Sequence, residues 1–153
     1  MQPPQFTACQ FATQELGWQQ AIRQCCQPLI EARQISIDYV DAIISETLTG
    51  GPYYIISPGF ALPHARPEQG VITAETCFSL LRLAQPVAFA NGERVSLIIV
   101  LAAGNGRQHT DAITHLLTWL DDGKLERLMQ ACDRAELEEC VNVSVASGTD
   151  PLS

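Results

Sequence analysis

The feature that most constrains the fold is a nearly unbroken apolar run from Val95 to Ala103, which is followed by Gly104-Asn105-Gly106. The run is about half the ~20 residues that a membrane-spanning helix needs, so it predicts no transmembrane segment. The glycines after it predict a loop. A continuous apolar strand is typical of the middle of a sheet that is covered on both faces. The run therefore predicts a central, buried strand.

Other parts of the chain carry helical and extended patterns. Apolar residues recur at three- and four-residue spacing in several segments, which is the stripe of an amphipathic helix. The predicted helices are Glu15 to Ala32, a segment capped by Ser36 and ended by Gly50-Gly51-Pro52, a segment from His109 to about Asp121, and Arg134 to about Val143. Further strands are predicted from Tyr53 to Ser57 and from Thr76 to Ala84, the second bounded by Pro86. Strands interleaved with helices predict an α/β three-layer sandwich, with helices on both faces of a sheet.

The size of the chain fits one domain. It has 153 residues, of which 46% are hydrophobic and 17% charged, within the ordinary globular range. We expect a single domain over residues 1–153, with an ordered core from about 14 to 146. The first 13 residues are polar and contain proline, and the stretch from Ser147 is polar too, so both ends are predicted to fray.

Composition excludes several classes of function. Nine Lys and Arg against 17 Asp and Glu give a net charge of −8, which repels a nucleic-acid backbone. The N-terminus lacks the basic flank and apolar run of a secretory signal, which predicts a cytoplasmic protein. The six cysteines contain no C-x-x-C pair and are interpreted as small apolar residues rather than disulfides or metal ligands. The usual nucleotide-binding loops and the nucleophile elbow are absent from the sequence.

One segment carries candidate chemistry: Ser57-Pro-Gly-Phe-Ala-Leu-Pro-His-Ala-Arg-Pro-Glu68. Its prolines exclude a helix interior and present His64 on a stiffened backbone, two residues before Arg66. A neutral imidazole has a free nitrogen near neutral pH, which a nucleophile toward phosphorus requires. The competing interpretation is a histidine that only satisfies hydrogen bonds in the loop. The chemistry of the segment alone does not favour one interpretation over the other.

His109 is a second candidate because it opens a predicted helix after the buried strand. Helix N-termini favour anions, and α/β proteins often bind ligands beyond strand ends. The competing interpretation is a solvent-exposed first-turn residue. His115 lies roughly 240° around that helix from His109, so the two cannot share a face, and we interpret His115 as structural or exposed. Arg66 can pair with Glu68 or contribute charge to an anion pocket.

The stretch Gly59-Phe-Ala-Leu-Pro-His64-Ala-Arg-Pro resembles the phosphorylation-site motif of the fructose/mannitol-type enzyme IIA domains of the bacterial sugar phosphotransferase system. The longer stretch from Gly51 to Val71 looks most like the ascorbate-type branch and its relatives, including cryptic mannitol-type components. The resemblance covers most of the chain, from about Trp18 to Val141. It implies an α/β fold with a mixed β-sheet flanked by helices.

The resemblance also implies a function, that of a cytoplasmic phosphotransferase component without cofactor or metal. His64 would accept a phosphoryl group from the histidine-containing phosphocarrier protein and pass it to a cysteine of enzyme IIB, with His109 stabilising it. Ser45-Glu46-Thr47-Leu48 stands where mannitol-type proteins carry an arginine, and Arg66 is a substitute suggested by the ascorbate-like branch. Both partners would use one surface, for which Phe60, Leu62 and Ile56 are the predicted apolar rim.

Three alternatives stay open at this point. Similar domains serve as phosphorylation-responsive regulatory modules, with the same histidine as a switch. A metal-dependent hydrolase built on His64, His109 and an acidic residue is the second, although no ligand pair has the usual i, i+4 spacing. A purely structural protein is the third. The sequence identifies neither the transported sugar nor the oligomeric state, including whether the chain forms a homodimer.

Overall fold

The computed structural model of the chain describes residues 4–141. One mixed sheet runs through this part, with the strand order β1-β4-β5-β3-β2. The strands are β1 (Phe6–Ala12), β2 (Ile55–Ser57), β3 (Gly59–Ala61), β4 (Cys77–Ala88) and β5 (Arg94–Ala102). β1 is parallel to β4 and β3 is parallel to β5, whereas β4 and β5 are antiparallel, as are β2 and β3.

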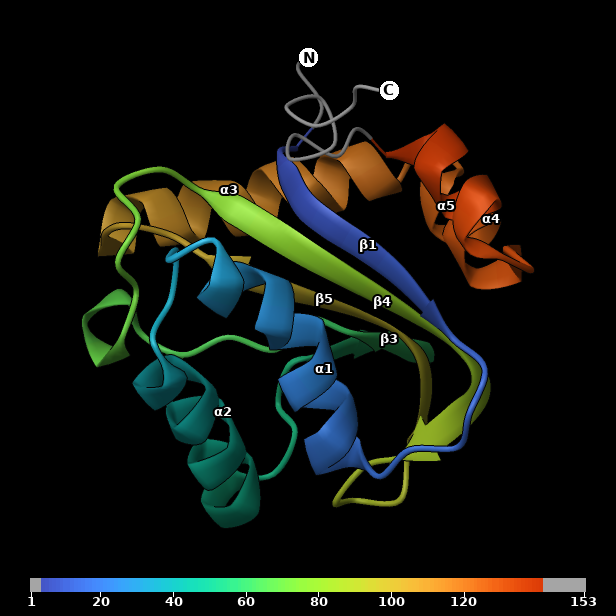
Figure 1. Cartoon of the computed structure of the whole chain (residues 1–153), viewed down its shortest axis with the longest axis horizontal. Coiled ribbons are helices and arrows are strands. Elements are labelled where there is room, and N and C mark those ends of the chain that lie inside the picture. The colour runs from blue at the N-terminus through green and yellow to red at the C-terminus, as the bar shows by residue number, and fades with distance from the viewer. Residues whose placement is uncertain (1–3, 142–153) are drawn as a thin grey trace.

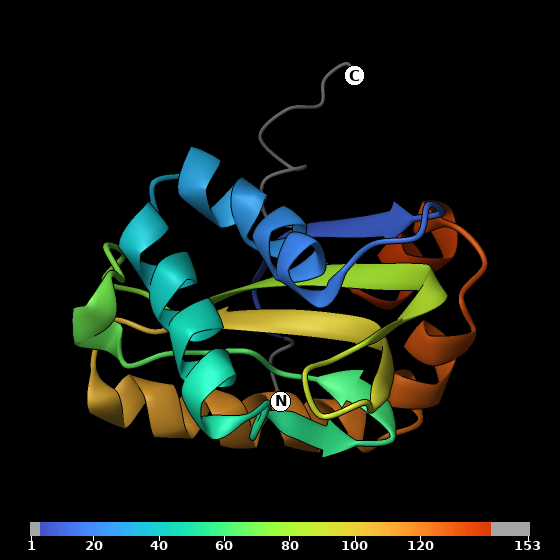
Figure 2. The same ribbon diagram turned by 90° about the horizontal axis from the view of Figure 1, so that it is seen from below.

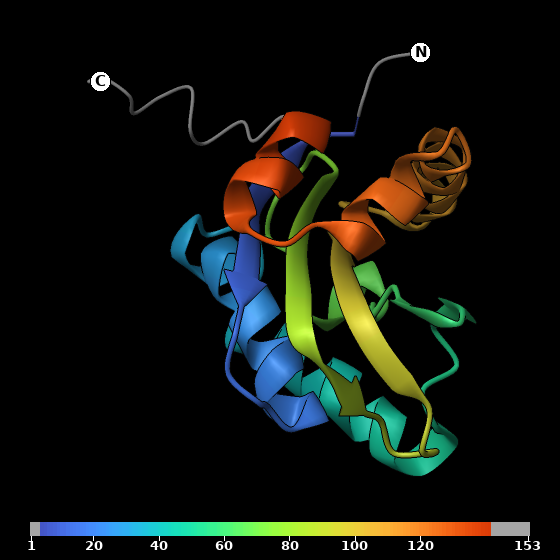
Figure 3. The ribbon, with the colours of Figure 1, turned by 90° about the vertical axis from the view of Figure 1, so that its right-hand side faces the viewer.

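Helices cover both faces of this sheet, so the predicted three-layer sandwich with a mixed sheet is confirmed (Figures 1 and 2). α1 (Trp18–Glu31) and α2 (Ile37–Gly50) lie on one face. α3 (Gly106–Leu120), α4 (Lys124–Gln130) and α5 (Arg134–Cys140) lie on the other, and in Figure 3 α4 and α5 lie in front of the strands with α1 behind them. No helix among residues 4–141 combines the length and apolarity needed to cross a membrane.

The central strand β5 explains why the sheet is covered twice. Alternate residues of a strand point to opposite faces, and here both sets are apolar. Ile98, Val100 and Ala102 join the core under α1 and α2. Leu97, Ile99 and Leu101 join the core under α3, α4 and α5. The unbroken apolar run was therefore correctly interpreted as a central strand.

The predicted start of the ordered core near residue 14 is wrong. Residues 6–12 form β1, which pairs with β4 and completely buries the side chains of Phe6 and Cys9. The polar residues of this segment suggested a frayed end, but an edge strand needs only part of its side chains in the core. The predicted fraying from Ser147 and the predicted end of the last helix at Val143 lie outside the described residues.

Other boundaries also differ from the predictions: α1 begins at Trp18 rather than at Glu15, and β2 begins at Ile55 rather than at Tyr53. α3 begins at Gly106 rather than at His109, because Asn105 caps it with its side chain.

β4 continues past Pro86 to Ala88. Proline cannot donate to the ladder, but Pro86 lies where the register between β4 and β5 shifts, between Arg82 and Val87, so the strand passes through it.

Candidate functional site

The topology brings His64 and His109 together. β3 and β5 are parallel neighbours, so their carboxyl ends lie next to each other at the same end of the sheet. His64 follows β3, and His109 lies in the first turn of α3, directly after β5. Their imidazole rings lie edge to face with centroids 4.9 Å apart. The structure therefore assembles the two candidate histidines into one site.

The hydrogen bonding of His64 fixes which nitrogen is available. Its Nδ1 lies 2.7 Å from the carbonyl oxygen of Leu62. A carbonyl only accepts hydrogen bonds, so we assign the proton to Nδ1, which leaves the lone pair on Nε2. The half-buried ring has its pKa lowered by desolvation, against the opposing effects of the Leu62 carbonyl and of Glu46. His64 is therefore a neutral imidazole at neutral pH, with Nε2 as its nucleophilic atom.

The backbone around His64 is held at three successive residues. The amide of Leu62 donates to Tyr54 O at 2.9 Å, and the carbonyl of Pro63 accepts from Leu101 of β5 at 3.4 Å. The carbonyl of His64 itself accepts from the Tyr53 hydroxyl at 3.0 Å. The Tyr53 ring also meets the His64 ring edge on, with centroids 5.6 Å apart. These contacts present the imidazole in one position at the edge of the sheet.

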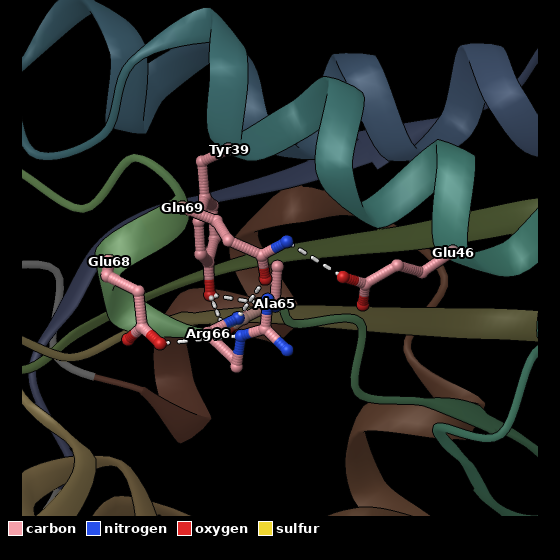
Figure 4. Close-up of polar contacts among 6 residues, drawn as sticks. All are labelled: Tyr39, Glu46, Ala65, Arg66, Glu68 and Gln69. Atoms are coloured by element: carbon pink, nitrogen blue, oxygen red, sulfur yellow. Dashed lines mark hydrogen bonds and ion pairs between the residues drawn. The ribbon is translucent and has the colours of Figure 1, made fainter.

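The segment after His64 is tied to α2 (Figure 4). Ala65 N donates to the Tyr39 hydroxyl at 3.2 Å. Arg66 N donates to the side-chain oxygen of Gln69 at 2.7 Å, and the Gln69 amide donates to Glu46 at 2.8 Å. Two side chains of α2 therefore hold the chain directly beyond the histidine.

His109 approaches the site from the amino end of α3. The Asn105 side chain accepts from Gln108 N at 2.9 Å and so caps this helix. Nδ1 of His109 is buried and has no hydrogen-bond partner among the described residues. Burial lowers the pKa of His109, and the neighbouring His64 lowers it further. A buried nitrogen without an acceptor is best left unprotonated, which assigns the proton of a neutral His109 to Nε2.

Arg66 and His115 lie differently from this pair. The Arg66 guanidinium is 3.4 Å from Glu68, and both side chains are more than two-thirds exposed. Such an exposed pair contributes little to stability. His115 is partly buried beside a separate cavity of about 320 Å³, which Phe78 and Asp111 also line. His109 does not line this cavity.

The predicted rim of Phe60 and Leu62 is wrong. Phe60 is 1% exposed and Leu62 is 0% exposed. Both side chains pack into the core under α3 and α4, because Phe60 of β3 and Leu62, two residues further along the extended chain, point to the same face. Ile56, 45% exposed, stays available for contact, and Tyr53, 55% exposed, lies beside the His64 ring. Tyr53 is therefore the exposed ring beside the imidazole, and Ile56 is the one residue of the predicted rim that stays exposed.

Sequence reasoning also missed the residues that hold the loop: Tyr39, Gln69 and Tyr53. Glu46 was noticed only as a departure from the mannitol-type pattern. Tyr39 carries a weak signal, since it is a polar-tipped residue on the buried stripe of α2. Gln69 and Tyr53 carry none, because their contacts with residues 64 to 66 depend on how the loop closes.

Among residues 4–141, no group of three or more His, Cys, Asp or Glu side chains is placed so that it could hold a metal ion. The metal-dependent hydrolase thus has no ligand set there. The interpretation of the cysteines as apolar residues fits Cys9, Cys25, Cys26 and Cys77, which are all buried. Desolvation raises the pKa of Cys25 to about 12, so its thiol is inert, whereas Cys132 is exposed.

Comparison with known proteins gives matches over most of the chain. Residues 8–143 match the family described as "Phosphoenolpyruvate-dependent sugar phosphotransferase system, EIIA 2". The mannitol-specific cryptic phosphotransferase enzyme IIA component of Escherichia coli K12 is 39% identical over 127 residues, covering 82% of this chain and 85% of that protein. The ascorbate-specific EIIA component of Mycoplasma pneumoniae is 37% identical, covering 78% and 76%. The solution structure of a mannitol-specific cryptic enzyme IIA from Escherichia coli has a TM-score of 0.77 at 36% identity, covering 88% and 90%.

Proposed function

Because this chain belongs to the EIIA 2 family of the phosphoenolpyruvate-dependent sugar phosphotransferase system, we propose that it relays a phosphoryl group on His64. The donor is the histidine-containing phosphocarrier protein, and the acceptor is a cysteine of a cognate enzyme IIB in the cytoplasm. The observation that carries this proposal is the arrangement of the two imidazoles. Nε2 of His64 has a free lone pair beside a second neutral histidine, with ring centroids 4.9 Å apart.

The first transfer is an in-line displacement at phosphorus. Nε2 of His64 forms the new N–P bond with its lone pair while the P–N bond of the donor breaks, and that electron pair returns to the donor ring. His64 keeps the Nδ1 proton that it shares with the Leu62 carbonyl. The donor ring, protonated on its other nitrogen, leaves as a neutral imidazole. Because both rings keep a proton, the step balances without an added acid or base.

His109 stabilises the phosphoryl oxygens during this step. In the assigned tautomer its Nε2–H is a hydrogen-bond donor beside His64, and fixed donors stabilise the charge that develops in phosphoryl transfer. The first-turn amides of Gly106 and Arg107 add donors without an intrahelical acceptor. Arg66 contributes positive charge at the rim. In the second transfer a thiolate of enzyme IIB attacks the phosphorus, the N–P bond breaks, and His64 returns to a neutral ring.

The contact surface for both proteins includes Tyr53, which lies beside the His64 ring, and Ile56, which stays exposed on β2. Because the partners would use it in turn, each contact is expected to be small and short-lived.

Intact mass tests the proposal after incubation with phosphoenolpyruvate, enzyme I and the histidine phosphocarrier. We expect one acid-labile phosphoryl group on the wild-type chain and none on His64→Ala. His109→Ala should be phosphorylated at a rate lower by roughly a hundredfold or more, the usual effect of removing one fixed donor. A phosphoryl group that persists on His64→Ala would contradict the proposal. A phosphorylated chain that does not discharge onto enzyme IIB would instead favour the regulatory module.

A further inference from the structure

Glu46 places a carboxylate beside the candidate site, and it forms no ion pair with another side chain of residues 4–141. It lies on α2, is partly buried, and accepts a hydrogen bond from the Gln69 side chain at 2.8 Å. Gln69 in turn accepts from Arg66 N at 2.7 Å, so the carboxylate is fixed over the loop that begins at His64 (Figure 4).

Tyr53 connects this carboxylate to the histidine. Its hydroxyl donates to the His64 carbonyl at 3.0 Å. Burial raises the pKa of Tyr53 and the charge of Glu46 raises it further, whereas the charge of Arg66 lowers it by less. The same charge raises the pKa of His64, although burial lowers it more. Glu46 therefore acts electrostatically on the imidazole and on the residue that holds it.

The nearest basic side chain of the loop does not cancel this charge. Arg66 pairs with Glu68 at 3.4 Å. That pair is exposed and screened by water, whereas Glu46 is partly buried and hydrogen-bonded. Screening is weaker for a partly buried charge, so the site carries a net negative bias from α2.

From this arrangement we propose that Glu46 raises the phosphoryl-transfer potential of His64. The inference rests on the proposed function, because it concerns the stability of the phosphorylated histidine. Phosphorylation adds two negative charges on the phosphoryl group and one positive charge on the ring, so the site gains one net negative charge. The carboxylate repels this added charge. Glu46 thus destabilises the phosphorylated form and favours discharge to the next protein.

The test is Glu46→Gln, which removes the charge while its amide oxygen can still accept from Gln69. The matched control is Glu139→Gln, which removes the same charge from the exposed side of α5, a helix that packs on β1 at the opposite edge of the sheet. Each protein is equilibrated with a known amount of phosphorylated histidine phosphocarrier, and intact mass gives the equilibrium constant of the transfer. A urea unfolding curve for each variant verifies that it is folded.

We expect Glu46→Gln to shift this equilibrium toward the phosphorylated chain by roughly threefold to tenfold, the effect of one partly screened charge. Glu139→Gln should leave it unchanged. Raising the salt concentration from about 50 mM to about 500 mM should narrow the difference between wild type and Glu46→Gln without abolishing it, because salt screens a partly buried charge only in part. A phosphorylated wild type with no shift in folded Glu46→Gln overturns this inference alone. A folded wild type that takes up no phosphoryl group overturns the proposed function and this inference with it.

Discussion

The hydroxyl of Tyr39 joins α2 to the residue that follows His64. It accepts from Ala65 N at 3.2 Å and donates to Leu101 O, at the carboxyl end of β5, at 2.6 Å. Tyr39 is fully buried, and both backbone groups lie in buried residues. One side chain thus connects a helix, the central strand and the loop of the candidate nucleophile.

Tyr39→Phe should weaken both the fold and the site. Removing the hydroxyl leaves Ala65 N and Leu101 O without this partner in the interior, and an unsatisfied buried group costs roughly 1–3 kcal/mol. We expect a lower free energy of unfolding in urea and slower phosphorylation, because the backbone beside His64 loses an anchor.

Tyr54→Phe is the control for that variant. Tyr54 is also buried, and its hydroxyl lies 2.6 Å from the Thr47 side chain rather than bonding the backbone of residues 64 to 66. It should lose a similar amount of stability and retain the wild-type rate of phosphorylation. Equal rates in the two variants would show that the Tyr39 hydroxyl does not position the site.

The pH dependence follows from the lowered pKa values of both histidines. An ordinary histidine titrates near pH 6.5, so both rings should stay neutral to a lower pH than that. The rate of phosphorylation should therefore hold down to about pH 6.5 and fall only below it. Nitrogen NMR of the imidazoles measures both midpoints and also the predicted Nδ1–H form of His64. Midpoints above 6.5 would contradict the burial argument.

The same shifts predict how stability responds to acid. Well above pH 6.5 both rings are neutral in the folded and the unfolded chain, so they contribute no pH dependence there. Below it the unfolded chain binds protons that the folded chain does not, so the folded state loses stability as pH falls toward the lowered values. His64→Gln, which cannot bind that proton, should lose less stability between pH 7 and 5 than wild type, as urea unfolding measures.

The sequence was most informative where structure depends on local pattern. Three features were identified in this way: the β5 run, the stripes of α1 and α2, and the Pro-rich motif around His64. Each is a pattern among residues that lie close together in the sequence. β3 was missed because its three residues form a strand only by pairing with β5. α4 was missed because a seven-residue helix with Leu128 as its buried residue has no resolvable periodicity.

The same contrast between local sequence pattern and contacts of distant residues applies to the site. His64 and His109 were identified from their local settings, and the parallel pairing of β3 with β5 brought them together. The burial of Phe60 could not be read from its motif. Gly59 has φ +85°, and a Cβ there would lie 2.6 Å from the Met129 side chain. That close approach of α4 covers the strand, and it depends on residues far away in the sequence.

The burial of Phe60 reverses what its substitution should do. As part of an exposed rim, Phe60→Glu would have left the fold intact, but a carboxylate at a residue that is 1% exposed must break the core. We expect Phe60→Ala to cost roughly 3–5 kcal/mol in urea unfolding, as is usual for a buried phenylalanine. A loss below about 1 kcal/mol would contradict this burial.

Ile56→Glu is the variant that tests the contact surface instead. Ile56 is 45% exposed, so the change should alter stability by no more than about 0.5 kcal/mol. It should slow phosphorylation by the phosphocarrier protein, because a charge replaces an apolar contact. The control is Ile72→Glu, at an isoleucine that is 60% exposed and lies beyond η1 (Pro67–Gln69). Equal rates for both variants would place the contact surface elsewhere.

The cap of α3 gives a last prediction, because Asn105 fixes the turn that carries His109. Its side chain accepts from Gln108 N at 2.9 Å, and Asp133 caps α5 in the same way by accepting from Glu136 N at 2.9 Å. Replacing either by alanine should cost roughly 0.5–2 kcal/mol of stability. Only Asn105→Ala should also slow phosphorylation, because the loosened first turn lets His109 move away from His64.

Asp133→Ala is the control for this variant. The two helices lie on the same face of the sheet, but α5 packs against β1, the outer strand on the side away from His64. A wild-type rate in folded Asn105→Ala would therefore show that His109 does not depend on its cap, and an equal slowing in Asp133→Ala would assign the effect to general loss of stability.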